Sequence, residues 1–235
     1  MRYILGIDIG TTAIKGAVIG EDGKIYGTKT SEYPLTTLPT GEVEADLQLY
    51  INAFTQSIKG AVEDAKVDVA DIKCVGFSST AETCVFLDKY NEPLCKVIAW
   101  MDTRATKEAE YLTAHFDKKD IINKVGFDGI YAIHPVSKIL AVKNKNPEIF
   151  EKTRMFAQIK DYFIFKLTGT YYTDHSTASD HGFFDITNRC YWNEMLEFTG
   201  IKEEYLPKLV EPGTELGTIS REAALEFGLN PETKI

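Results

Sequence analysis

Near the start of the chain, a short stretch combines residues that could hold a phosphate and a metal ion. An apolar segment ends in Asp8, Ile9 and Gly10, and Thr11 and Thr12 follow. Gly10 lets the backbone close on an anion, and the two threonines offer hydroxyl and N–H donors to phosphate oxygens. Asp8 can hold Mg²⁺ directly or through water. The pattern therefore predicts a phosphate-binding turn with one metal ligand.

The residues after this turn predict a strand rather than a helix. Ile14, Gly16 and Val18 alternate with their neighbours, and Glu21–Lys24 has the composition of a hairpin turn. A Walker loop or a dinucleotide fingerprint instead runs from a strand into a helix. An ordinary glycine hairpin is the alternative, and the coincidence of an acid, a glycine and two threonines disfavours it.

A second candidate site is the segment Gly76–Thr83, where a strand ends in hydroxyl residues and an acid. Ser79 and Glu82 could supply the fixed polar partners that sugar hydroxyls require, since an unmatched buried polar group costs about 1–3 kcal/mol. A solvated turn with Glu82 in water explains the same residues equally well.

Trp100, Asp102 and Arg104 form a third candidate site at the end of a predicted strand. The indole could stack on a sugar face, and the two charged groups could bind hydroxyls. A structural interpretation is slightly favoured, in which Trp100 belongs to the core, Asp102 caps the next helix and Arg104 offsets its charge.

His134 precedes a proline and a predicted helix, where it could reach a ligand, although a lone loop histidine usually has no chemical role. The hydroxyl-rich loop Thr173–Ser179 is interpreted as structural, because local bonding between side chains and backbone explains it.

The composition excludes several classes of protein. The chain has 235 residues, 44% of them hydrophobic, and a net charge of −9, so we expect a packed globular protein that does not bind nucleic acid. It lacks an apolar run long enough to cross a bilayer and an N-terminal leader, which predicts a cytoplasmic protein. Its four cysteines lack the CxxC spacing of metal or redox sites.

Periodicity predicts an α/β fold. Strands are expected at 4–9, 14–18, 72–77, 83–87 and 97–100, and helices at 44–65, 104–115, 137–145 and 159–167, with a short helix from Pro147. From Gly182 on, turn signals alternate with short segments that include 192–198 and 221–227. Lys234 and Ile235 have the character of a strand start, so we expect the domain to continue beyond them.

Four motifs in this order resemble the N-terminal domain of the FGGY family of carbohydrate kinases, nearly from end to end. They are Gly6–Gly16, Gly76–Thr83, Ala99–Ala105 and Ile159–Ser179. The resemblance implies a ribonuclease-H-like domain of the actin, Hsp70 and sugar kinase superfamily, with a mixed β-sheet flanked by helices. Residues 1–235 would form the sugar-binding domain, and the nucleotide-binding domain would lie outside this chain.

The resemblance also implies roles for individual residues. The chain would be the substrate-binding half of a kinase that uses ATP and Mg²⁺ to phosphorylate a small sugar, sugar acid or polyol. Gly10, Thr11, Thr12 and Lys15 would bind phosphate and Asp8 the metal. Substrate contacts are expected from Ser79, Ala81, Glu82, Trp100, Asp102, Arg104 and His134. The general base, an aspartate, is expected beyond Ile235, so this chain alone should be inactive.

The resemblance does not identify which sugar or polyol is the substrate. The pair Ala81 and Glu82 matches neither glycerol kinases nor xylulokinases fully, and other segments resemble gluconate and xylulose kinases in turn. Ala141 and Ile133 replace aromatic residues common in the family, which weakens a glycerol assignment. The oligomeric state is also open, homo-oligomers included. Two other functions are alternatives: a non-catalytic sugar-binding or regulatory module, and an ATP-driven activator of a metalloenzyme, which the scattered cysteines disfavour.

Overall fold

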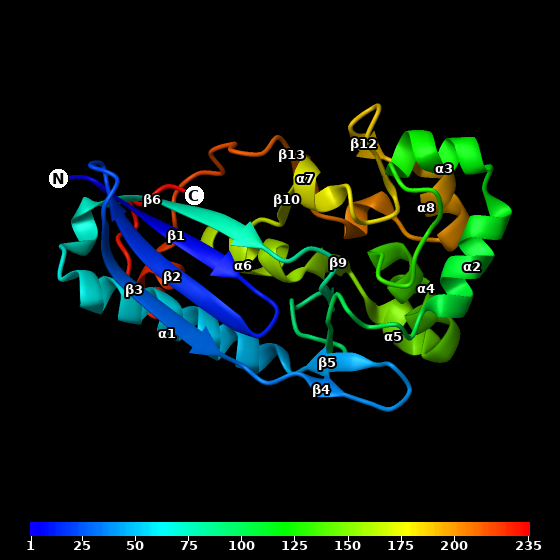
Figure 1. The fold of residues 1–235 in the computed structure, drawn as a ribbon, viewed down its shortest axis with the longest axis horizontal. Coiled ribbons are helices and arrows are strands. Elements are labelled where there is room, and N and C mark those ends of the chain that lie inside the picture. Colours follow the sequence, from blue (N-terminus) through cyan, green and yellow to red (C-terminus); the bar gives the residue numbers. More distant parts are fainter.

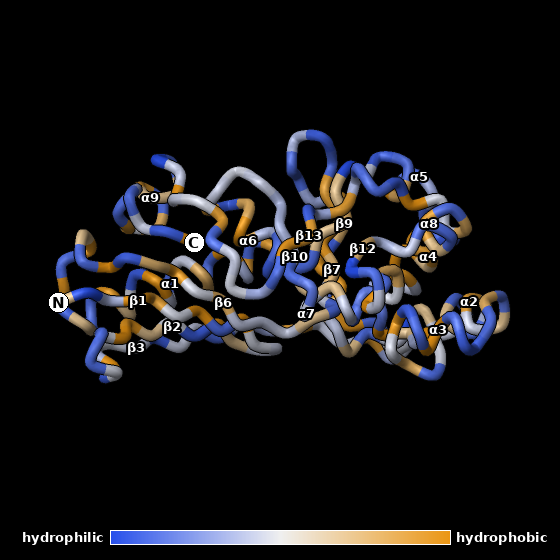
Figure 2. Tube along the Cα trace, turned by 90° about the horizontal axis from the view of Figure 1, so that it is seen from above, coloured by the Kyte–Doolittle hydropathy of each residue, from blue (hydrophilic) through white to orange (hydrophobic).

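The computed structural model describes all 235 residues and contains two packed regions (Figure 1). One region, the sheet lobe, is built on a four-stranded sheet in the order β3-β2-β1-β6. The other, the helical lobe, collects α2, α3, α4, α5 and α8, and Figure 2 shows the same division from above. Each lobe has its own hydrophobic cluster, of 30 and 19 buried residues. The predicted α/β fold is confirmed.

The strands are β1 Tyr3–Ile9, β2 Ala13–Gly20, β3 Ile25–Glu32, β4 Thr36–Thr37, β5 Val43–Ala45, β6 Ile72–Ser79, β7 Cys84–Leu87, β8 Val97–Ile98, β9 Met155–Gln158, β10 Tyr172–Asp174, β11 Phe184–Asp185, β12 Cys190–Tyr191 and β13 Lys208–Val210. The α-helices are α1 Leu47–Ala65, α2 Thr106–His115, α3 Lys118–Val125, α4 Pro135–Lys145, α5 Pro147–Lys152, α6 Ile159–Thr168, α7 His175–Ala178, α8 Asn193–Thr199 and α9 Arg221–Phe227.

The main sheet is mixed. β1 pairs antiparallel with β2 and parallel with β6, and β2 pairs antiparallel with β3. The register places Asp8 opposite Lys15 on β2 and beside Ser78 on β6. Lys234 forms a parallel bridge to Cys74, which places the predicted new strand beside β6.

Helix α1 covers one face of this sheet. Its buried side chains recur at helical spacing and include Tyr50, Phe54, Ile58 and Ala61. The helix approaches β3 so closely that a Cβ atom at Gly27 would lie 2.2 Å from the Ala65 nitrogen, so the contact requires glycine there.

A five-stranded sheet in the order β4-β5-β8-β7-β9 connects the lobes. It explains why α1 begins three residues after the predicted start, since Val43–Ala45 form β5 and pair with β8. Pro135 occupies the first turn of α4, which therefore begins two residues before the predicted helix. Helix α3 and strand β9 were not predicted, and α8 and α9 were expected only as short segments between turns. No helix combines the length and apolar character needed to cross a membrane.

Candidate functional site

The predicted phosphate turn joins β1 to β2, as the sequence indicated. The Gly10 N–H donates to the carbonyl of Ala13 at 3.0 Å and closes the turn. A Cβ atom at Gly10 would lie 3.0 Å from that oxygen, so a larger residue would crowd the turn. Thr12 is exposed and Thr11 is half-buried at the tip. Their side chains and N–H groups are therefore placed where a phosphate could approach.

Asp8 and Lys15 lie side by side at the base of the hairpin. Lys15 Nζ is 3.5 Å from Asp8 Oδ2, and the two side chains are 59% and 45% exposed. Together with Ser78 they line a shallow depression of about 420 Å³. An accessible carboxylate suits Mg²⁺, which proteins commonly bind through one or two carboxylates plus substrate phosphates. The chain has no cluster of three or more His, Cys, Asp or Glu side chains suited to a fully protein-made metal site.

The hydroxyl-rich segment after β6 lies next to the hairpin. Ser79 pairs with Ile9 in the parallel register, and the Thr80 N–H donates to the Ile9 carbonyl at 2.9 Å. The Ser79 hydroxyl donates to the Thr80 carbonyl at 2.7 Å, so its proton is used within the loop. The structure thus brings the first two predicted sites together. Ala81, a predicted substrate contact, follows Thr80 in this segment and is half-buried.

Glu82 is held by its backbone, and its side chain is left without a protein hydrogen bond. Its φ of 65° is left-handed, a conformation that a non-glycine residue keeps only when its surroundings fix it. The N–H donates to Gln158 Oε1 at 2.5 Å, and the carbonyl accepts from Lys138 Nζ at 2.8 Å. Burial raises the pKa of Glu82 to about 7, although nearby Lys138 lowers it. Glu82 is thus a buried acid whose carboxylate accepts no hydrogen bond from the protein.

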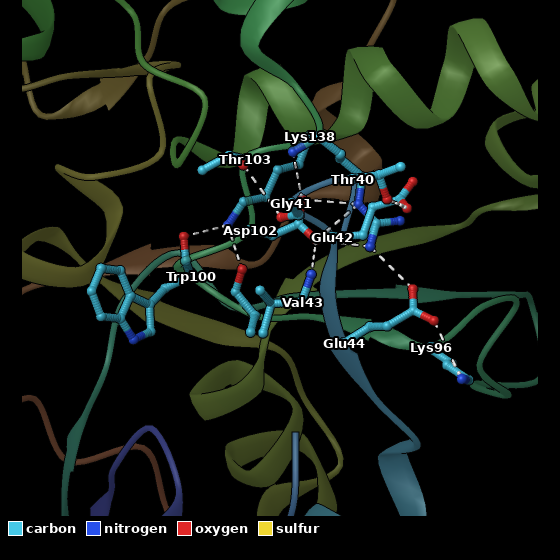
Figure 3. Close-up of polar contacts among 12 residues, drawn as sticks. Thr40, Gly41, Glu42, Val43, Glu44, Lys96, Trp100, Asp102, Thr103 and Lys138 are labelled. Atoms are coloured by element: carbon cyan, nitrogen blue, oxygen red, sulfur yellow. Dashed lines mark hydrogen bonds and ion pairs between the residues drawn. The ribbon is translucent and has the colours of Figure 1, made fainter. Parts of the chain in front are cut away.

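Lys138 joins two parts of the site and was not predicted as a site residue. Its side chain is fully buried, and its ammonium donates to the carbonyls of Glu82 and Ala99 at 2.8 and 2.9 Å. It also donates to the carbonyl of Trp100 at 3.1 Å (Figure 3). These acceptors take all three of its protons. Burial lowers the pKa of Lys138. The available signal was a lysine among the apolar residues of α4, which suggests a buried cation with fixed partners.

Trp100 connects this region to the phosphate hairpin. Its Nε1–H donates to Thr11 Oγ1 at 2.9 Å, while its indole projects away from the contacts around Lys138 (Figure 3). The hydroxyl of Thr11 accepts this bond and keeps its own proton for another partner. The third predicted site therefore meets the first through one side-chain contact.

Asp102 and Arg104 bind each other inside the protein. Asp102 is fully buried and accepts from the Val43 N–H at 2.6 Å and from Arg104 Nη2 at 2.8 Å. Arg104 Nη2 also donates to Glu44 at 3.0 Å. These contacts fasten the turn after Trp100 to β5, which is a positioning role. Direct contact of Asp102 and Arg104 with substrate stays a prediction.

His134 is also buried, at the N-cap of α4. Its Nδ1 accepts from the Tyr131 N–H at 3.2 Å, and its Nε2 has no hydrogen-bond partner. Burial lowers the pKa of His134 to about 4, with a smaller contribution from Lys138. The imidazole is therefore neutral near pH 7, and its predicted contact with substrate is likewise untested. The loop interpreted as structural contains α7, whose Thr177 N–H is capped by Asp174 at 3.0 Å.

Comparison with known proteins places these features in one family. The chain matches the FGGY family of carbohydrate kinases, N-terminal domain, over residues 3–235. It is 30% identical to a xylulose kinase of Bacillus subtilis, covering 100% of this chain and 47% of the relative. It is also 30% identical to a gluconokinase of the same organism, covering 98% of this chain and 44% of the relative.

Solved structures agree with these matches. A gluconate kinase and a ligand-bound xylulose kinase, both from Lactobacillus acidophilus, superpose with TM-scores of 0.92 at 30% identity, each covering all of this chain and 47% of theirs. The predicted sugar kinase fold is thereby confirmed. The chain spans about half the length of the curated relatives it matches.

Proposed function

Because the chain belongs to the FGGY family of carbohydrate kinases, we propose that it is the substrate-binding half of an ATP-dependent kinase acting on a small sugar, sugar acid or polyol. The hydrogen bond from Trp100 to Thr11 is the observation that carries this proposal. It ties a side chain suited to stacking on a sugar to the turn suited to phosphate, as transfer between two substrates requires.

Different residues would bind ATP and the sugar. Gly10, Thr11 and Thr12 would donate to phosphate oxygens of ATP, and Lys15 would offset their charge. Asp8 would hold Mg²⁺, which supplies neutralisation of charge on the phosphoryl group. Glu82 would accept hydrogen bonds from substrate hydroxyls, because its carboxylate is free of protein donors.

Phosphoryl transfer needs one group that we place outside this chain. A base aspartate expected beyond Ile235 would take the proton from the attacking hydroxyl as its oxygen bonds to the γ-phosphorus and ADP leaves. We therefore propose that a downstream domain supplies this base and the adenosine site, and that residues 1–235 alone bind sugar weakly without turnover.

Coupled ADP release tests the proposal. The full-length protein would be assayed with Mg-ATP and xylulose, ribulose, gluconate, glycerol, erythritol and fuculose in turn. Turnover that depends on one of them is expected. A folded protein that binds ATP but releases no ADP with any of them would favour the non-catalytic sugar-binding or regulatory alternative.

A further inference from the structure

We propose that the sugar site accepts neutral sugars and polyols and discriminates against sugar acids. The inference rests on the proposed kinase function and narrows its substrate class. Its basis is the balance of charged groups around Glu82, where free carboxylates outnumber free cations. Among the relatives reported above, one is named for xylulose, a neutral sugar, and one for gluconate, a sugar acid. The inference favours a substrate of the first kind.

Two carboxylates gather at this site. Gln158 accepts from the Glu82 N–H at 2.5 Å and donates from Nε2 to the Thr177 carbonyl at 3.4 Å, which ties Glu82 to the end of α7. Asp180 follows on the same turn, and its N–H donates to that carbonyl at 3.4 Å. The two acids are near enough for the charge of Asp180 to raise the pKa of Glu82 further. Neither carboxylate accepts a hydrogen bond from a basic side chain.

The neighbouring cationic side chains already have partners within the protein. Lys138 donates all its protons to the three backbone carbonyls described above. Arg104 is bound by Asp102 and Glu44. Lys160, which is 8% exposed, is paired with Asp174. Each of these groups would have to break existing buried contacts before it could bind a carboxylate on a ligand.

These charges act differently on two kinds of ligand. A hydroxyl can donate to the Glu82 carboxylate, so a neutral polyol gains a charge-assisted hydrogen bond. A sugar carboxylate brings a third negative charge near Glu82 and Asp180 and loses its hydration, while the charged Lys138 ammonium has no proton left to donate to it. The difference should exceed about tenfold in affinity, since two charges near a protein surface interact by a few kcal/mol.

Ligand pairs that differ mainly in the acid group test the inference. The full-length protein would be titrated at pH 8 with D-glucitol and D-gluconate, and with D-xylitol and D-xylonate, following tryptophan fluorescence without ATP. The neutral member of each pair should bind at least about tenfold more tightly. Glu82→Gln and Asp180→Asn should each narrow that ratio. Glu197→Gln, at an exposed glutamate on α8, is the matched control and should leave it unchanged.

The outcomes separate this inference from the kinase proposal. Equal or tighter binding of the acids would overturn it, as would binding of neither class. A neutral preference that persists in both site variants would also overturn it, because the carboxylates would then not be the cause. A neutral preference without ADP release would support the inference and contradict the kinase. Conversely, D-gluconate as the best substrate would support the kinase and overturn the inference.

Discussion

Trp100 Nε1 lies 2.9 Å from Thr11 Oγ1 and donates a hydrogen bond to it. The two residues are 89 positions apart in the sequence, on the turn after β8 and on the hairpin between β1 and β2. The contact fixes the distance between the proposed sugar and phosphate sites. It also leaves the hydroxyl proton of Thr11 free to point at a phosphate.

Replacing Trp100 with phenylalanine should uncouple these two sites. Trp100→Phe keeps an aromatic face but removes the N–H donor, and a hydrogen bond of this kind contributes about 1 kcal/mol. We expect kcat of the full-length protein for phosphoryl transfer to fall about fivefold or more, with a smaller change in the KM for sugar. Tyr90→Phe, on an exposed ring, is the control. An unchanged kcat would show that the contact has no role in transfer.

Neutralising Asp8 should stop turnover while leaving the fold intact. Asp8→Asn removes the proposed Mg²⁺ ligand, and we expect kcat to fall by about a hundredfold or more. The exposed pair with Lys15 adds little to stability, so the melting temperature should hardly change. Sugar binding without ATP should also persist. Asp120→Asn on α3 serves as the control, and normal turnover by Asp8→Asn would refute the assigned role.

Sugar affinity should rise with pH because of Glu82. Its pKa is raised to about 7 in the protein, so the carboxyl is mostly protonated at pH 6 and mostly ionised at pH 8. Lys138 lowers this pKa and Asp180 raises it, while His134 is neutral across this range. The affinity for a neutral polyol should increase through pH 7 and then level off. Glu82→Gln should flatten this profile, and the same slope in the variant would assign it to another group.

Two buried histidines should destabilise the protein in acid. Burial lowers the pKa of His181 to about 3 and that of His134 to about 4, both below the unfolded value of 6.5. The unfolded chain therefore binds more protons below pH 6.5, and stability is lost as the pH falls from there toward 4. The raised pKa values of Glu82 and Asp161, both about 7, act in the opposite direction, because burial favours their protonated forms.

A His181→Leu variant isolates the histidine contribution. Neither ring nitrogen of His181 has a hydrogen-bond partner, so a similar apolar volume loses no polar contact. Relative to the wild type, its free energy of unfolding should gain about 2 kcal/mol more at pH 5 than at pH 8. Denaturant unfolding at the two pH values measures this difference. An equal gain at both would mean that His181 does not titrate below its ordinary range.

The buried ion pair of Asp102 and Arg104 should contribute to the stability of the fold. Asp102→Ala leaves Arg104 with Glu44 alone and leaves the Val43 N–H without its acceptor. Removing one partner of a buried pair costs about 3–5 kcal/mol. Urea unfolding should show a loss of this order, and Asp120→Ala should show almost none. A small loss for Asp102→Ala would mean that water replaces the carboxylate.

The sequence predicted turns and helices that depend on neighbouring residues. It did not predict features that depend on contacts between residues far apart in the chain. The hairpin around Gly10 and helix α6 are confirmed, because turn chemistry and periodicity determine them locally. The start of α1 was placed too early because Val43–Ala45 pair with β8, and no local pattern reports such pairing. Lys138, Gln158 and Asp180 were missed as site residues since each acts through a partner distant in sequence. The structural interpretation anticipated that Arg104 offsets the charge of Asp102, but it placed Asp102 as a helix cap, whereas the N-cap of α2 is Ala105 and Asp102 accepts from the Val43 N–H.

The most direct test of the account follows the phosphoryl group itself. The full-length protein would be incubated with Mg-ATP and its best sugar, and the products followed by ³¹P NMR. A sugar phosphomonoester that appears in step with ADP is the predicted result, with transfer by Asp8→Asn slower by about a hundredfold or more. Release of inorganic phosphate alone, or equal transfer by that variant, would contradict the claim that this hairpin serves phosphoryl transfer to a sugar.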